Sequence, residues 1–107
     1  MEINQYQIIL VNLDLTVGSE MKKTRPCLVV SPNEMNKYIN TVVVLPITSI
    51  SKNYPSRVQL INQKVNGWIV VEQIKTIDKK RIIKVLDALN NSEIQKIKNC
   101  IKQIFID

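Results

Sequence analysis

The chain has 107 residues, of which 45% are hydrophobic and 22% are charged, and this composition indicates one globular domain over residues 1–107 rather than a disordered chain. No apolar run approaches the ~20 residues that cross a bilayer, and no secretory signal precedes the first strand pattern, so we expect a cytoplasmic protein without membrane contact. The net charge of +6, with a pI near 9.5, favours a polyanionic partner such as nucleic acid, although it can also serve solubility alone.

The first predicted elements are two strands that flank a charged loop. Residues 6–13 are rich in β-forming side chains and predict a strand that stops at Asp14. A loop follows, with Gly18 at its bend. Residues 27–30 form a short continuous apolar run, which predicts a strand buried on both faces.

A short helix is predicted after the second strand. Ser31 and Glu34 have the spacing of a capping box, and Pro32 between them suits the first helical position. The helix would carry Met35 and Ile39 inward.

The middle of the chain predicts three further strands. Residues 40–47 give the strongest strand pattern, and Pro46 indicates that this strand ends or lies at a sheet edge near that point. Residues 57–60 alternate strictly between polar and apolar side chains. The Asn66-Gly67 pair predicts a hairpin turn, and the chain continues as a strand over residues 68–71.

The last elements are a further short strand over residues 82–86 and a C-terminal helix. Ser92 and Gln95 predict a capping box at the start of the helix. One face of the helix carries apolar side chains at helical spacing, namely Ile94, Ile97, Ile101, Ile104 and Phe105. Five or six short strands and one terminal helix predict a mostly β protein of the α+β kind, folded as a small, curled, antiparallel barrel.

Metal and cofactor sites have few residues to draw on. The chain has no histidine, and its two cysteines, Cys27 and Cys100, are distant in sequence, so neither a metal nor a cofactor is predicted. We expect both cysteines to be reduced and to pack as small hydrophobic residues, with a disulfide as the alternative. Acid–base chemistry would have to use carboxylates, arginine, lysine, tyrosine or hydroxyl groups.

The loop before the second strand carries more chemistry than a turn needs. It holds Glu20, Lys22 and Lys23, and Arg25 lies next to Pro26, which keeps Arg25 extended and fixes its direction. An arginine fork matches a phosphate, and a nearby carboxylate would complete an acid–base set. A simple surface ion pair is the alternative.

Two other strand ends carry polar pairs. Thr48 and Ser49 follow the third strand, and their hydroxyls with free backbone N–H groups suit a phosphate, although a polar turn looks the same. Glu72 and Gln73 follow the strand predicted over residues 68–71 and could bond to base edges of unstacked RNA, or be a solvated strand end. Trp68 could stack a base but is more often a core residue.

A cluster of basic residues lies in the window 75–84, where Asp78 is the only acid. Such a cluster suits either contact with a nucleic-acid backbone or a solvated face. Its members are Lys75, Lys79, Lys80, Arg81 and Lys84.

These segments, in this order, resemble the MazF/PemK family of toxin endoribonucleases from toxin–antitoxin pairs. The likeness rests on "ILVNLDLTVGSEMKKTRPCLVVSP", "NTVVVLPITS", "YPSRV" and "GWIVVEQIKTIDKKRI" with the closing helix, which together span nearly the whole chain. Some PemK-type members use a histidine in their acid–base set, so the chain looks like the MazF branch. The resemblance implies an SH3-like barrel of the CcdB/PemK type, a homodimer, and inhibition by a MazE-like antitoxin.

The resemblance also implies an activity, which is metal-independent cleavage of single-stranded RNA at a short sequence. It assigns catalysis to Arg25 and Thr48 and places Glu20 and Ser49 in the same site. We therefore predict Glu20 as a third catalytic residue, either as a base or as a group that orients Arg25. Glu72 stands where the family usually has aspartate, which leaves the geometry of base recognition open. We assign RNA binding to a set of polar and charged residues, namely Ser49, Lys22, Lys23, Glu72, Gln73, Arg57 and Lys75.

Two alternatives belong to other functional classes. A relative on the same barrel, CcdB, inhibits DNA gyrase without nuclease activity, but it depends on a tail ending in tryptophan, glycine and isoleucine, whereas this sequence ends with Ile104, Phe105, Ile106 and Asp107. A basic barrel that binds nucleic acid without chemistry is the other alternative. Neither the cleaved RNA sequence nor the antitoxin can be derived from one chain.

Overall fold

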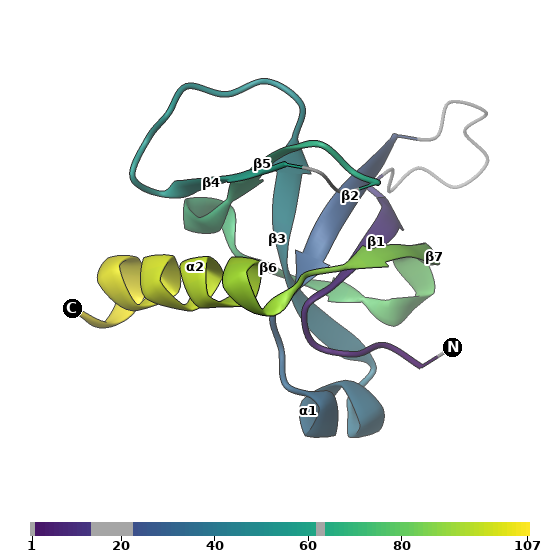
Figure 1. Ribbon diagram of the computed structural model, residues 1–107. Helices are drawn as coiled ribbons and strands as arrows, with labels where there is room; N and C mark the ends of the chain where they lie inside the picture. The colour runs from purple at the N-terminus through teal and green to yellow at the C-terminus, as the bar shows by residue number, and fades with distance from the viewer. Residues whose placement is uncertain (1, 14–22, 62–63) are drawn as a thin grey trace.

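The computed structural model describes residues 2–13, 23–61 and 64–107 (Figure 1). The described part contains strands β1 (Gln7–Asn12), β2 (Thr24–Val29), β3 (Thr41–Thr48), β4 (Arg57–Leu60), β5 (Gly67–Val70), β6 (Lys75–Asp78) and β7 (Ile82–Ala88). Its helices are α1 (Asn33–Tyr38) and α2 (Asn91–Ile101), with short 3₁₀ turns η1 (Val71–Gln73) and η2 (Lys79–Arg81) and a wider closing turn η3 (Lys102–Ile106).

The strands form one curled sheet in the order β4-β5-β3-β2-β1-β7, and β6 joins it by pairing with β3. Every one of these pairings is antiparallel. The α2 helix lies along one side of the sheet, and α1 projects from the opposite end of the molecule to the loop between β3 and β4 (Figure 1). The prediction of a small antiparallel barrel with a short internal helix and a C-terminal helix is confirmed.

Both faces of the three central strands, β1, β2 and β3, are buried, which explains their continuous apolar runs. One cluster joins Ile8, Leu28 and Leu45 to the inner face of α2 at Ile97. The alternate residues of the same strands face a second cluster, which includes Ile9, Cys27, Val29 and Val44 together with Ile77 of β6. Successive side chains of a strand point to opposite faces, so each central strand contributes to both clusters.

The β2 strand begins earlier than the sequence pattern predicts. Arg25 and Pro26 belong to the strand and stand opposite Val11 and Leu10 of β1. Pairing with β3 begins only at Cys27, so Pro26 lies beyond the end of that ladder. The extended backbone that proline imposes on the preceding residue lets the strand continue through Arg25.

The β3 strand continues two residues past Pro46 and ends at Thr48, near the predicted point. Pro46 is buried inside the strand and stands opposite Cys27 of β2. On its other side, β3 pairs with β6 through Val44 and with β5 from Ile47 onward. Pro46 therefore lies where the partner on that side changes, a position that tolerates a residue without an N–H group.

The start of α1 differs from the predicted capping box. Pro32 is the N-cap and no side chain caps the helix. The Ser31 hydroxyl instead donates to Asn36 Oδ1 at 2.5 Å and accepts from the Val43 N–H at 3.0 Å. Ile39 is exposed rather than inward, because the helix ends at Tyr38 and buries Asn36.

The β4–β5 connection is also longer than a two-residue turn. Gly67 is the first residue of β5 and stands opposite Leu60, so the turn prediction for Asn66-Gly67 is wrong. The sequence analysis missed β6, because only Ile77 of its four residues is buried and the alternating pattern is short.

The α2 helix begins at a capping box two residues earlier than predicted. Asn90 Oδ1 accepts from the Glu93 N–H at 2.9 Å, and Glu93 Oε1 accepts from the Asn90 N–H at 3.0 Å. Ile104 and Phe105 are exposed, although the spacing predicts them on the buried face. Among the described helices, none is long and apolar enough to span a membrane.

Candidate active site

A pocket of about 270 Å³ opens between the start of β2 and the end of β3. It brings together residues that are distant in sequence, because β2 and β3 are antiparallel neighbours. The start of one strand and the end of the other therefore meet at the same edge. The pocket is lined by Thr24, Arg25, Pro26, Ile47, Thr48, Ser49 and Asn66.

Arg25 and Thr48, two of the three predicted catalytic residues, both line this pocket. Arg25 is exposed, whereas Thr48 is half-buried as the last residue of β3. Thr48 Oγ1 donates to the Ile50 carbonyl oxygen at 3.2 Å, so the threonine side chain also ties the following loop to the strand. Ser49, next in the chain, is exposed at the rim.

The backbone of Thr48 is held by a close approach of β5. Gly67 has φ +151°, and a Cβ atom at this position would lie 2.5 Å from the Thr48 carbonyl oxygen. Only glycine fits this approach without displacing Thr48. Trp68, the next residue, stands opposite Thr48 and is half-buried, so its prediction as either a core or a stacking residue stays open.

Two cations act on the buried thiol of Cys27, which follows the pocket residue Pro26 in the chain. Burial raises the pKa of Cys27 to about 11, while the charges of Lys75 and Arg25 act in the opposite direction. Lys75, opposite Val44 on β3, is therefore within electrostatic range of the same point as Arg25. Both cysteines are free and buried, as predicted.

Arg57 and Glu72 form an ion pair beside the loop over residues 49–56. Arg57 Nε donates to Glu72 Oε1 at 2.9 Å and Nη2 donates to Oε2 at 3.3 Å. The Ser56 hydroxyl donates to Glu72 Oε1 at 2.7 Å. The Arg57 hydrogen bond is the main cause that lowers the pKa of Glu72.

The other site residues that the structure describes lie outside the pocket lining. Gln73 is exposed at the end of η1, and Lys23 is exposed immediately before β2. The Lys23 carbonyl accepts from the Leu13 N–H at 2.7 Å. Glu20 and Lys22 fall outside the described residues, so their assignment stays a prediction.

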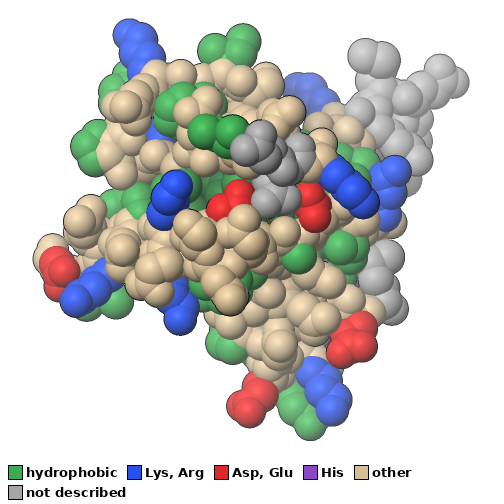
Figure 2. Space-filling model, in the orientation of Figure 1, with side chains coloured by type: hydrophobic (Ala, Val, Ile, Leu, Met, Phe, Trp, Pro, Cys, Tyr) green, Lys and Arg blue, Asp and Glu red, His purple; other side chains and the backbone are tan. Residues whose placement is uncertain are grey.

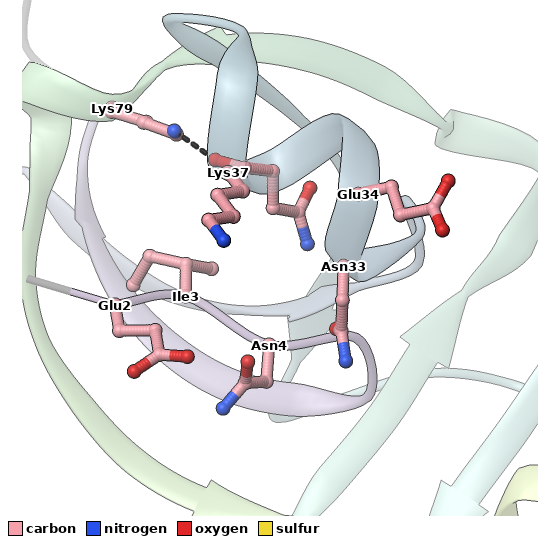
Figure 3. Close-up of a pocket in the computed structure, with 8 residues that line it drawn as sticks. Glu2, Ile3, Asn4, Asn33, Glu34, Lys37 and Lys79 are labelled. Atoms are coloured by element: carbon pink, nitrogen blue, oxygen red, sulfur yellow. Dashed lines mark hydrogen bonds between the residues drawn. The ribbon is translucent and has the colours of Figure 1, made fainter.

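A larger hollow of about 600 Å³ lies at the other end of the molecule, beside α1 (Figure 3). Its lining mixes charges of both signs, since it includes Glu2 and Glu34 as well as Lys37 and Lys79, although Glu34 points away from the two lysines in Figure 3. Lys79 Nζ donates to the Asn36 carbonyl, so this lysine has a structural partner. On the face shown in Figure 2, basic side chains are spread out rather than gathered over one spot.

Two pocket residues were missed by the sequence analysis. Thr24 precedes Arg25 directly, and its place in a strand shared with Arg25 was the available indication. Asn66 was interpreted only as a turn residue, although it precedes the glycine that contacts Thr48. Within the described ranges, no group of three or more histidine, cysteine or acidic residues could hold a metal ion.

Comparison with known proteins gives consistent likenesses over nearly the whole chain. The family described as "PemK-like, MazF-like toxin of type II toxin-antitoxin system" matches residues 4–105. An endoribonuclease MazF of Staphylococcus epidermidis is 32% identical over 105 residues, covering 92% of this chain and 88% of that protein.

Solved structures show the same fold. The crystal structure of MazF from Deinococcus radiodurans superposes with a TM-score of 0.82 at 22% identity, covering 97% of this chain and 96% of that chain. A mycobacterial endoribonuclease in complex with its cognate antitoxin gives a TM-score of 0.80 at 22% identity, covering 94% and 92%.

Proposed function

Since the chain belongs to the PemK-like, MazF-like toxin family of type II toxin–antitoxin systems, we propose that it is an endoribonuclease that cleaves single-stranded RNA at a short specific sequence. The observation that carries this proposal is the pocket that unites Arg25 with Thr48 and Ser49. A guanidinium opposite two hydroxyls suits a phosphate group. The comparisons do not favour the gyrase-inhibitor alternative, because they match MazF proteins.

The proposed reaction is a displacement within the RNA. The 2′-oxygen forms a bond to the adjacent phosphorus, and the bond from phosphorus to the 5′-oxygen of the next nucleotide breaks. The 2′-hydroxyl loses its proton and the leaving 5′-oxygen gains one, so the products are a 2′,3′-cyclic phosphate and a 5′-hydroxyl.

Each pocket residue has a part in this scheme. Arg25 stabilises the negative charge that develops on the phosphate and takes part in proton transfer, while Thr48 and Ser49 hold the phosphate oxygens. Glu20 acts as the base or orients Arg25. Because the chain has no histidine, positioning and electrostatic stabilisation supply most of the rate. The scheme does not require a metal ion.

RNA binding is proposed to extend from this pocket along the neighbouring polar residues. The lysines of this set would contact phosphates and the Gln73 amide would select bases, while Arg57 and Glu72 would act through the neighbouring loop. This set includes Lys22, Lys23, Arg57, Glu72, Gln73 and Lys75.

The test is cleavage of a long, defined single-stranded RNA in EDTA, with the cut sites and the end groups mapped. Arg25→Ala and Thr48→Ala are compared with Lys98→Ala, which removes an exposed cation of α2 outside the pocket. We expect cuts at one recurring sequence for the parent and Lys98→Ala, and a loss of at least about 100-fold for the other two. Products with 3′-hydroxyl ends, or no cuts by a folded parent, would refute the proposal.

Two partners follow from the proposal. A basic protein of this size suits an acidic, partly disordered antitoxin that covers the pocket, and a related structure contains a cognate antitoxin. We also propose a homodimer acting in the cytoplasm, since Phe105 and Ile106 expose 49% and 74% of their surface on η3. Light scattering would test the dimer, and cleavage that persists under saturating antitoxin would exclude that inhibitor.

A further inference from the structure

The loop over residues 49–56 leaves the site directly after Thr48 and is held at its far end by Arg57. The Arg57 Nη1 atom donates to the Ser51 hydroxyl at 2.6 Å, which reaches back toward the start of the loop. The guanidinium also lies 5.1 Å from the centre of the Tyr54 ring. The Arg57 N–H donates to the Tyr54 carbonyl at 3.0 Å.

Glu72 completes this arrangement from a separate element, the η1 turn. Its carboxylate accepts from two nitrogen atoms of Arg57 and from the Ser56 hydroxyl. Glu72 therefore binds both the arginine and the last residue of the loop. A backbone hydrogen bond joins the same two segments, since the Val71 N–H donates to the Ser56 carbonyl at 3.0 Å. A third element also contributes, since Cys100 of α2 lies 3.4 Å from the Pro55 carbonyl oxygen.

The three nitrogen atoms of the Arg57 guanidinium are thus all engaged within the protein. Arginine offers five N–H donors in a rigid fork, and its pairing with a carboxylate is directional. An arginine that served mainly as a phosphate contact would leave this fork free. The geometry instead suits a residue that fixes a loop.

We propose that Arg57 and Glu72 form a clamp that fixes the loop over residues 49–56 beside the pocket and thereby determines which RNA sequence is cut. The clamp acts through the loop, so both are positioning residues. Loop position also affects catalysis, because the loop departs from Thr48, the last residue of β3, and begins with Ser49. This inference rests on the proposed nuclease function and deepens it.

The experiment compares Arg57→Gln, Glu72→Gln and the exchanged pair Arg57→Glu with Glu72→Arg. Lys75→Gln is the matched control, because Lys75 is an exposed cation near the site that has no clamp contact. Three quantities are measured: the ratio of cleavage at the best and second-best sequences, the dependence of RNA affinity on salt, and amide exchange of the loop.

If Arg57 and Glu72 form a clamp, Arg57→Gln and Glu72→Gln each change the ratio of cleavage at the best and second-best sequences by about tenfold, as expected for misplaced substrate contacts. The salt dependence of binding stays at the parent value in Glu72→Gln and Arg57→Gln, whereas Lys75→Gln lowers the slope by about 0.7, one phosphate on a single strand. The exchanged pair recovers the parent ratio, because the ion pair is restored with reversed polarity. Amides of Tyr54 and Arg57 exchange faster in both single variants.

Other results would distinguish a failure of the clamp proposal from a failure of the nuclease proposal. If the parent cuts RNA and both single variants keep its sequence ratio, the clamp is overturned while the nuclease stands. A slope lowered by about 0.7 in Arg57→Gln alone makes Arg57 a direct phosphate contact, which also overturns the clamp. If the parent cuts no RNA, the nuclease fails, and unchanged loop exchange in both variants then overturns the clamp independently.

Discussion

The substitution Gly67→Ala tests whether the approach of β5 to Thr48 holds the site in place. A Cβ atom would lie 2.5 Å from the Thr48 carbonyl oxygen, about 0.5 Å closer than the 3.0 Å that real contacts respect. The backbone at φ +151° is also unfavourable for alanine, at a cost of about 1–3 kcal/mol. The Thr48 backbone must therefore move, and it cannot move far without disturbing its pairing with Trp68.

Two effects should appear together. We expect the free energy of unfolding to fall by about 2–3 kcal/mol, and the cleavage rate of the folded enzyme to fall about tenfold, since a 1 Å misplacement costs about 100-fold. Urea unfolding followed by Trp68 fluorescence gives the first quantity, and single-turnover cleavage below the transition gives the second.

The control is Leu89→Ala, a core substitution away from the pocket that costs a similar 2–5 kcal/mol. If Gly67→Ala loses no more activity per folded molecule than Leu89→Ala, the close approach does not position Thr48. If Gly67→Ala is as stable as the parent, the strain argument is wrong.

Three further expectations concern the rest of the described structure. Because burial raises the pKa of Cys27 to about 11 and Cys100 is also buried, a thiol reagent at neutral pH should modify both only after denaturation, and rapid reaction of the native protein would contradict this. Hydrogen bonding to Arg57 lowers the pKa of Glu72, so the stability advantage of the parent over Glu72→Gln should hold above pH 4.5 and shrink as the pH falls below it. A pH-independent difference between the two proteins in urea unfolding would show that the ionised Glu72 carboxylate does not contribute to stability. Asn90→Ala should destabilise the protein by about 1 kcal/mol through loss of the N-cap, whereas equal losses for Ser92→Ala would favour the predicted capping box over the observed one.

The fold class could be predicted from the sequence because the central strands carry unmistakable apolar runs. Both faces of β1 to β3 are buried, so their patterns required no tertiary information. The β6 strand could not be predicted in this way, since its stability comes from pairing with β3 and only Ile77 is buried. Pairing between strands that are distant in sequence is invisible to local periodicity.

Helix starts and turns were also mispredicted where contacts between residues distant in sequence determine the structure. Ser31 has the residue type of a cap, but its hydroxyl bonds to Asn36 inside the protein instead. Asn66 and Gly67 have the composition of a turn, but Gly67 is required where β5 meets Thr48. In each case a contact between residues distant in sequence outweighs the local preference. Asn66, which lines the pocket, is one of the residues whose role was mispredicted for this reason.

Arg25 and Thr48 could be predicted as a pair only through family resemblance, since residue type alone left a surface ion pair and a polar turn as alternatives. The antiparallel pairing of β2 with β3 supplies the physical reason that they share a pocket. The partnership of Arg57 with Glu72 could not be foreseen, because it joins the start of β4 to a 3₁₀ turn.

The change of partners along β3 divides the molecule into parts that can be altered separately. Residues Thr41 to Val44 are paired with β6, whereas Ile47 and Thr48 are paired with β5 and carry the pocket. Two segments supply pocket residues at this end of β3, since Ser49 begins residues 49–56 and Asn66 ends residues 64–66. A new base preference can therefore be sought by grafting these two segments from a relative, with the β6 half of the strand retained as an unchanged scaffold.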